Sequence, residues 1–148
     1  MEAILAGYAH ELLALAAECQ VKIVTIVEPV LDLGDRWNGI PVVKSDQQAL
    51  DAGISGHYVS GIDSPKIRRH LDELYSRHDC LPADLIAEPN KPGCETGPGL
   101  IKQWNVLVSC DVKIGRCVKI NVGATVMHDA ELGDYCIVAP HAVLLGRR

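Results

Sequence analysis

A six-residue period near the end of the chain constrains its fold more than any other feature. From Val106 onward the sequence divides into seven rows of six residues, and the third residue of every row is aliphatic. The first residue of every row is small or β-branched. An ordinary strand alternates every two residues and turns after about 8–12, so it would not keep this register through seven rows. The third-position residues are Val108, Ile114, Ile120, Val126, Leu132, Val138 and Leu144.

Such a period predicts a three-sided prism. Six residues make one flat face and one corner, so about eighteen residues complete a coil. The large aliphatic residue fills the interior, and the small residue four positions later lies near a tight corner. Glycine directly after the aliphatic residue, as at Gly115 and Gly133, helps the backbone to turn. Because the backbone hydrogen bonds run between coils, we predict that residues 89–148 form a left-handed parallel β-helix.

The same register extends backwards with one departure. Thr96, Gly97 and Leu100 fit the aliphatic-equivalent, glycine and small positions of earlier rows, but Lys102 stands where an aliphatic residue belongs. We therefore expect an irregular first coil. About three coils fit between Thr96 and the end of the sequence, which is near the minimum for a stable solenoid.

The first part of the chain alternates strand-like and helix-like segments. This order predicts right-handed βαβ units and a parallel sheet in an α/β domain over residues 1–88. The proline- and glycine-rich segment 88–99 is typical of a linker that leads into the β-helix. Predicted strands cover residues 3–6, 21–27, 57–61 and 85–87, and predicted helices cover 11–19, 45–52 and 64–78, the last two capped by Ser45 and Ser64.

Composition excludes several classes of protein. The net charge is −5 and no basic stripe is present, so nucleic-acid binding has little support. Tyr8, His10 and Glu11 interrupt the apolar N-terminal segment, which resembles neither a signal peptide nor a membrane span. The six cysteines form no CxxC pair. We therefore expect a cytoplasmic protein whose cysteines are reduced and mostly buried.

The stretch IGRCVKINVGATVMHDAELGDYCIVAPHAVLLG, residues 114–146, resembles the core of bacterial sugar O- and N-acetyltransferases. That family includes sialic acid O-acetyltransferases and bacillosamine-pathway N-acetyltransferases. The specific part is HDAELGDYCIVAP, with a histidine, an acidic residue and a Gly-Asp turn. The N-terminal half is similar to the Rossmann-like domain with which the family begins. The resemblance implies a homotrimer that transfers an acetyl group from acetyl-CoA, without a metal, to a hydroxyl or amine of a sugar or nucleotide-sugar.

The resemblance also implies roles for three residues of the repeat. His128 matches the general base, Asp129 matches the acidic residue that orients it, and Gly146 matches the residue whose backbone N–H holds the thioester oxygen. From the residues alone, His128 follows the interior residue Val126 by two positions and should project outward. An outward histidine is more often a solvated surface residue, but the repeat and the family pattern favour the catalytic interpretation.

The resemblance places three substrate-binding candidates in the N-terminal half. The first loop of the family typically reads Gly-Ala-Gly-Gly-His and faces the nucleotide-sugar, whereas this chain reads AGYAH over residues 6–10. His10 matches the loop histidine, and Glu28 stands where the family has an acidic residue. A backbone that approaches a phosphate closely needs the glycines. A plain strand-to-helix turn at Gly7 and an exposed, helix- or loop-facing carboxylate at Glu28 are therefore alternatives.

Other functions are less well supported. Cys110 precedes His128 by eighteen residues and should lie in the same column, but two ligands do not make a metal site. Carbonic anhydrases of this fold use three histidines, and the repeat holds only His128 and His141. The family normally continues for several more coils. Two hypotheses remain: an acetyltransferase of which this sequence is a fragment, and a truncated, inactive protein with a structural or interaction role.

Overall fold

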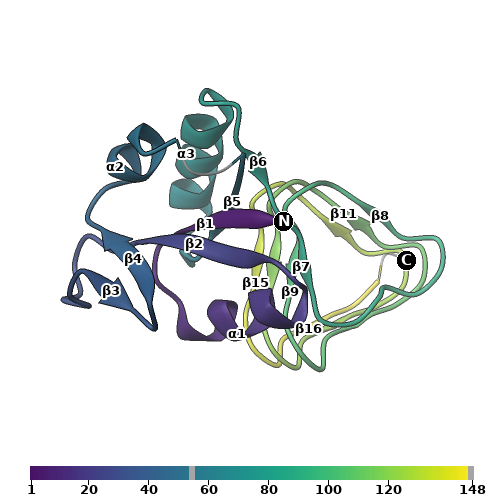
Figure 1. Ribbon diagram of the computed structural model, residues 1–148. Coiled ribbons are helices and arrows are strands. Elements are labelled where there is room, and N and C mark those ends of the chain that lie inside the picture. The colour runs from purple at the N-terminus through teal and green to yellow at the C-terminus, as the bar shows by residue number, and fades with distance from the viewer. Residues whose placement is uncertain (54–55, 147–148) are drawn as a thin grey trace. The chain divides into compact units, whose positions relative to one another are not determined.

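The computed structural model describes residues 1–53 and 56–146, drawn in Figure 1. The chain divides into two compact units, Met1–Asp63 with Ile67–Ala83, and Ser64–Lys66 with Asp84–Arg148. The predicted β-helix domain runs to Arg148, and its last two residues lie outside the described ranges.

The division after Ala83 falls ahead of the boundary expected after residue 88. The reason is β7 (Leu85–Ile86), which pairs in parallel with β9 (Ile101–Lys102) in the second unit. The strand expected over residues 85–87 exists, but it belongs to the first coil of the β-helix and not to the α/β sheet.

The N-terminal unit is built on one six-stranded sheet with the order β3-β4-β2-β1-β5-β6. All its pairings are parallel except that of β3 with β4. Figure 1 shows α1 on one side of this sheet and α2 and α3 on the other. The strands are β1 (Glu2–Ala6), β2 (Lys22–Val27), β3 (Arg36–Trp37), β4 (Ile40–Val43), β5 (His57–Ser60) and β6 (Leu81–Pro82), and the helices are α1 (His10–Glu18), α2 (Asp46–Asp51) and α3 (Pro65–Ser76).

Local sequence explains these elements well. Helix α2 begins after a capping box in which Ser45 and Gln48 satisfy each other's backbone N–H groups. The sheet buries Ile4, Val27 and Tyr58 against the helices. The described helices include none with the length and apolar character that crossing a membrane requires. The expected strands over 3–6, 21–27 and 57–61 and all three helices are present within two residues of their predicted bounds. The assignment of this unit as Rossmann-like stays a prediction.

The second unit consists of short parallel strands in three sheets, with the orders β10-β13-β16, β14-β11-β8 and β15-β12-β9-β7. Strands from β8 onward pair with strands eighteen residues away, as Leu107 pairs with Thr125. These features match the left-handed parallel β-helix that the repeat predicts. The remaining strands are β8 (Glu95–Thr96), β10 (Leu107–Val108), β11 (Lys113–Ile114), β12 (Lys119–Ile120), β13 (Thr125–Val126), β14 (Glu131–Leu132), β15 (Ile137–Val138) and β16 (Val143–Leu144).

The interior of the β-helix holds two columns of apolar residues and not one. The third-position residues from Val108 to Val138 are buried, and Leu144 packs against them. The first-position residues, such as Val112 and Val118, are as deeply buried and belong to the same cluster. Side chains from both columns therefore fill the prism, which explains why the first position is restricted to small or β-branched residues.

Lys102 occupies the interior position of β9, the strand that stacks on β7, as the interrupted pattern predicts. Its side chain is almost fully buried, at 1% exposure. The Nζ group donates to the backbone oxygens of Glu88 (2.9 Å) and Pro89 (3.3 Å) and to Oδ1 of Asn90 (3.0 Å). Three acceptors match the three N–H groups of an ammonium ion, so this charge is fully hydrogen-bonded at the beginning of the prism.

Candidate active site

His128 and Asp129 form a corner of the β-helix between β13 and β14. The interior residue Val126 is fully buried two positions earlier, and the chain then turns outward. Asp129 has φ of +61°, a left-handed conformation that aspartate tolerates better than most residues. The repeat therefore presents both side chains to solvent, as predicted for His128.

The side chains of His128 and Asp129 lie at ion-pair distance. Nδ1 of His128 lies 2.8 Å from Oδ2 of Asp129, and the side chains are 60% and 58% exposed. When Nδ1–H donates to this carboxylate, Nε2 carries the lone pair and faces away from Asp129. A histidine held in this way has the arrangement that a general base requires.

Gly146 lies one coil further along the β-helix, over the backbone carbonyl of His128. A Cβ atom at position 146 would collide with that carbonyl oxygen and come within 3.0 Å of its carbon. The neighbouring ladder bond from Met127 N to Leu144 O, at 2.9 Å, fixes the register of the two coils. Gly146, eighteen residues after His128, therefore stacks on it, and only glycine fits the space.

Among residues 106–146 as the structure describes them, the backbone bonds between coils are donated from the second, fourth and sixth row positions. His128 and Gly146 are both fifth in their rows of six. At two other fifth positions the N–H donates to a side chain: Arg116 N to Oδ1 of Asp134 (2.8 Å) and Val122 N to Oε1 of Gln103 (2.9 Å). The fold thus leaves the amide of Gly146 suited to a ligand oxygen beside the His128 corner.

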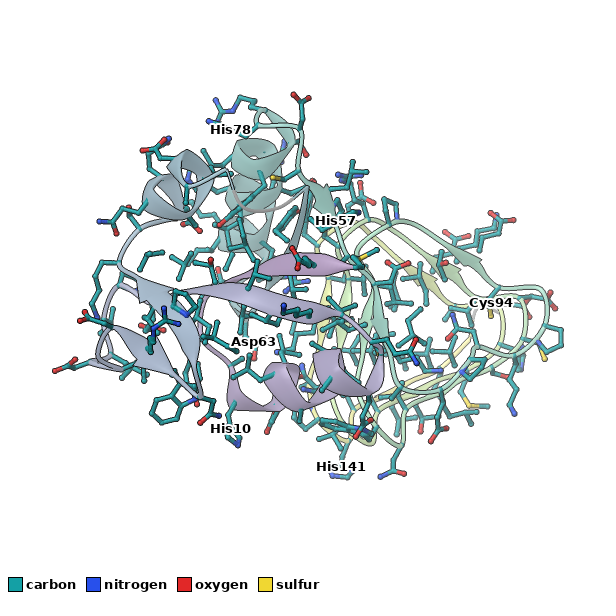
Figure 2. The ribbon with its side chains drawn as sticks, viewed as in Figure 1. His10, His57, Asp63, His78, Cys94 and His141 are labelled. Atoms are coloured by element: carbon teal, nitrogen blue, oxygen red, sulfur yellow. The ribbon has the colours of Figure 1, made fainter. Side chains whose placement is uncertain are left out.

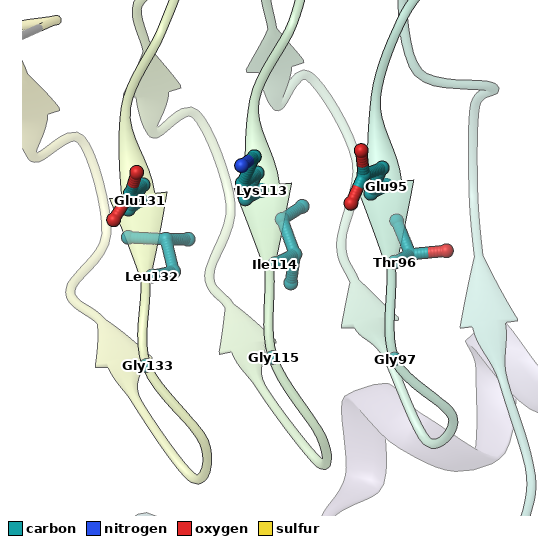
Figure 3. Close-up of a pocket in the computed structure, with 9 residues that line it drawn as sticks. All are labelled: Glu95, Thr96, Gly97, Lys113, Ile114, Gly115, Glu131, Leu132 and Gly133. Atoms are coloured by element: carbon teal, nitrogen blue, oxygen red, sulfur yellow. The ribbon is translucent and has the colours of Figure 1, made fainter.

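A shallow groove lies on the face formed by β8, β11 and β14, shown in Figure 3. The chain enters this face at β14, directly after the His128–Asp129 corner. The volume of the groove is about 540 Å³. Gly97, Gly115 and Gly133 form one column along it, and a Cβ atom at Gly97 or Gly115 would press on the next coil. The sequence identified two of these glycines only as aids to turning. The other residues that line the groove are Glu95, Thr96, Lys113, Ile114, Glu131 and Leu132.

Gly7 ends β1 in the N-terminal unit, and its conformation requires glycine. Its φ is +94°, and a Cβ atom would collide with the side chain of Ile62. Its N–H donates to the backbone oxygen of Val27 at 3.0 Å. The alternative of a strand-to-helix turn is therefore sufficient to explain this glycine.

Glu28 lies at the end of β2 and is 8% exposed, so the alternative of an exposed carboxylate is wrong. Its Oε1 accepts from the N–H groups of Val30 and Leu31, both at 3.0 Å, and its Oε2 accepts from Tyr8 N at 3.4 Å. Burial alone would raise the pKa of Glu28, but these N–H groups and the nearby Lys44 ammonium hold the pKa below its ordinary value.

His10 begins α1 and is exposed, with its side chain at the outer side of the helix in Figure 2. Its Nδ1 lies 3.2 Å from the hydroxyl of Tyr8. The ring of Tyr8 makes an edge contact with Trp37 of β3, with centroids 5.6 Å apart. The three predicted substrate-binding positions, Gly7, His10 and Glu28, thus surround one loop. Sequence reasoning did not identify Trp37.

Residues 111–146 match the family described as bacterial transferase hexapeptide (six repeats). The chain is 29% identical over 112 residues to a GDP-perosamine N-acetyltransferase of Escherichia coli O157:H7, an alignment that covers 74% of this chain and 50% of the relative. The chain thus spans half the length of this relative.

Two solved structures are similar over nearly the whole chain. PerB from Caulobacter crescentus, in complex with CoA and GDP-perosamine, has a TM-score of 0.83 at 23% identity, covering 99% of this chain and 72% of that one. The acetyltransferase domain of PglB from Neisseria gonorrhoeae FA1090, in complex with acetyl coenzyme A, has a TM-score of 0.80 at 21% identity, covering 96% and 72%. Together with the repeat match, these likenesses confirm the predicted resemblance to bacterial sugar acetyltransferases.

Proposed function

We propose that this chain belongs to an acetyltransferase, on the premise that residues 111–146 are a bacterial transferase hexapeptide region. The enzyme transfers an acetyl group from acetyl-CoA to an amine or hydroxyl of a sugar or nucleotide-sugar. The acetyltransferase names of the similar proteins support this proposal. The observation that carries it is the His128–Asp129 pair directly beneath Gly146.

His128 acts as the general base in this proposal. Its Nε2 takes the proton from the acceptor amine or hydroxyl as that group attacks the thioester carbonyl carbon, which is typically worth about 10²–10⁴ in rate. Asp129 stabilises the resulting imidazolium through the 2.8 Å contact to Nδ1. The imidazolium then returns the proton to the departing thiolate of CoA, which leaves both products neutral at the reacting atoms.

Gly146 stabilises the oxyanion in the same step. Its N–H would donate to the thioester oxygen as negative charge develops there. Loss of one such donor typically costs about 10²–10³ in rate. No metal is needed for this chemistry, because a thioester is already activated and the base and the donor come from the backbone and side chains of two adjacent coils.

The finer parts of the proposal concern the fold and the acceptor. The parallel strand order β4-β2-β1-β5-β6 with helices on both faces supports a Rossmann-like N-terminal domain. Gly7, His10 and Glu28 would then lie at the acceptor-binding loop. A homotrimer, which the family resemblance implies, and a cytoplasmic location, which the cysteine pattern favours, are part of the proposal.

The experiment is to incubate the protein with acetyl-CoA and a panel of acceptors: UDP- and GDP-linked amino sugars, the free amino sugars and sialic acid. Acetylated sugar is detected by mass spectrometry, because the exposed thiol of Cys110 would interfere with a thiol reagent. We expect one acceptor to gain an acetyl group in a reaction that His128→Asn abolishes.

His141→Asn is the matched control, because His141 is also a corner histidine of the same repeat. It should retain the activity. An acceptor panel without any product, together with no binding of acetyl-CoA, would support the alternative of an inactive protein with a structural or interaction role.

A further inference from the structure

The indole of Trp37, in β3, carries a hydrogen-bond donor that the protein does not use. Its Nε1–H is shielded from solvent, and within residues 1–53 and 56–146 no acceptor lies at hydrogen-bond distance from it. An indole N–H can only donate, and a buried one usually has a partner. Because an unpaired buried donor destabilises the folded state, an acceptor supplied by a ligand would explain why this group is placed here.

Trp37 lies beside the loop that carries the proposed acceptor-binding residues. Its ring and the ring of Tyr8 make an edge-to-face contact, with centroids 5.6 Å apart and ring planes at 76°. Tyr8 N donates to Oε2 of Glu28 at 3.4 Å, and the Tyr8 hydroxyl lies 3.2 Å from Nδ1 of His10. Both Tyr8 and Trp37 are only partly buried. An aromatic surface with an unused donor is therefore part of this loop site.

Glu28 indicates which part of a ligand would lie near Trp37. In Rossmann-like domains an acidic residue at the end of the second strand accepts from a ribose hydroxyl. A carboxylate accepts about four hydrogen bonds. The N–H groups of Tyr8, Val30 and Leu31 supply three, so capacity for a ribose hydroxyl remains. A nucleobase is bonded to the same ribose, so it lies close to this carboxylate and to the side chains around it.

The side chains after Glu28 suit a flat, apolar ring. Val30 and Leu31, whose N–H groups bind Glu28, are 84% and 52% exposed. Apolar and aromatic side chains bind the faces of all bases, so they do not select one base over another. Selection comes from the edge of the base. Uracil and thymine carry an oxygen at O4 and guanine carries one at O6, where cytosine and adenine carry an amino group. Only the oxygen can accept from an indole N–H.

We propose that Trp37 is a specificity-determining residue that donates its indole N–H to O4 of uracil or thymine or to O6 of guanine, so that the acceptor is a sugar linked to a uridine, thymidine or guanosine diphosphate. The inference rests on the proposed function, of which it names the substrate class. Because Nε1 is shielded in this structure, the indole turns when the base binds.

The test is a calorimetric titration of the full chain with UDP, GDP and CDP, which needs no acetyl transfer. CDP is the matched control for UDP, because it carries an amino group in place of O4. We expect UDP or GDP to bind at least about tenfold more tightly than CDP. Trp37→Phe keeps an aromatic ring beside Tyr8 but removes the N–H. It should bind the preferred nucleotide about tenfold more weakly and CDP as the wild type does.

Fluorescence tests the contact itself. The chain has two tryptophans, so Trp104→Phe leaves Trp37 as the only one. This variant should bind nucleotides as the wild type does, since Trp104 belongs to the β-helix unit. We expect the preferred nucleotide to change the emission of Trp37, because the indole turns and meets the base. Unchanged emission at saturating nucleotide would contradict the contact.

Equal affinity of the wild type for UDP, GDP and CDP, or no binding of any of them at millimolar concentration, would overturn the inference without recourse to a variant. A folded Trp37→Phe variant, checked by circular dichroism, that keeps the wild-type preference would also overturn it. Failure of the acceptor panel to yield any acetylated sugar would instead contradict the proposed function, while the titrations would still report on Trp37.

Discussion

Gly146 lies on the backbone carbonyl of His128, so that the proposed base and the proposed oxyanion donor are held by contact between two successive coils. The eighteen-residue spacing of the repeat produces this contact without any long-range contribution from the rest of the chain. Neither residue can move independently, because the ladder bond from Met127 to Leu144 joins the same two coils.

Gly146→Ala should therefore damage both the coil and the chemistry. The added methyl group collides with the His128 carbonyl and forces the coils apart, which typically costs about 1–3 kcal/mol of unfolding free energy. With the donor displaced, we expect kcat/KM for acetyl transfer to fall by about 10² or more. Gly133→Ala is the control for stability, because a Cβ atom there meets nothing within 4 Å. Equal urea midpoints for the two variants would contradict the close stacking at Gly146.

Lys102→Met tests the three hydrogen bonds that the buried Lys102 ammonium donates at the beginning of the prism. Methionine fills the interior position, but it leaves the oxygens of Glu88, Pro89 and Asn90 without their donor. We expect a loss of about 1–3 kcal/mol in unfolding free energy, measured by urea denaturation. Lys113→Met changes an exposed lysine of β11 and should alter stability by less than about 0.5 kcal/mol. An unchanged urea midpoint for Lys102→Met would show that these hydrogen bonds add nothing to the stability of the folded protein.

The lowered pKa of Glu28 predicts that the folded protein loses stability at acid pH. Its pKa in the folded protein lies below the ordinary value of 4.5, so the unfolded chain binds the proton more tightly. The stabilisation is complete above the unfolded pKa and is lost as the pH falls through the folded pKa. Urea midpoints measured between pH 3 and 7 should fall less steeply with acid in Glu28→Gln than in the wild type. Parallel curves for the two proteins would contradict the hydrogen bonds assigned to this carboxylate.

The β-helix could be predicted from the sequence because its information is local and repeated. Each row of six carries the same two interior positions, so errors at one row are corrected by the next. Helix α2 was equally accessible, since Ser45 and Gln48 form a capping box within four residues. The outward corner position of His128 could be predicted from the sequence alone, because His128 follows the interior residue Val126 by two positions.

The elements that were missed have different causes. The β3–β4 hairpin carries an available signal, since Asn38 and Gly39 form an Asn-Gly turn in which both residues have positive φ. The pairing of β7 was hidden because Leu85 pairs with a residue sixteen and not eighteen positions later. That most cysteines would be buried was wrong: among the described residues, Cys80 and Cys117 are buried and Cys110 is exposed.

The loop site was the least predictable part. The burial of Glu28 depends on Tyr8, twenty residues earlier, and on a turn that the sequence does not mark. The contact of Trp37 with Tyr8 depends on the hairpin that was missed. Both relationships arise from tertiary structure, which a single sequence without a repeat does not encode in any simple pattern.

The most direct test of the central claim separates binding from chemistry at His128. Acetyl-CoA affinity and the single-turnover rate of acetyl transfer should be measured for the wild type and His128→Ala with the best acceptor. We predict that the variant binds acetyl-CoA as the wild type does while its transfer rate falls by about 10²–10⁴. A variant that transfers acetyl groups at the wild-type rate would contradict the assignment of His128 as the base.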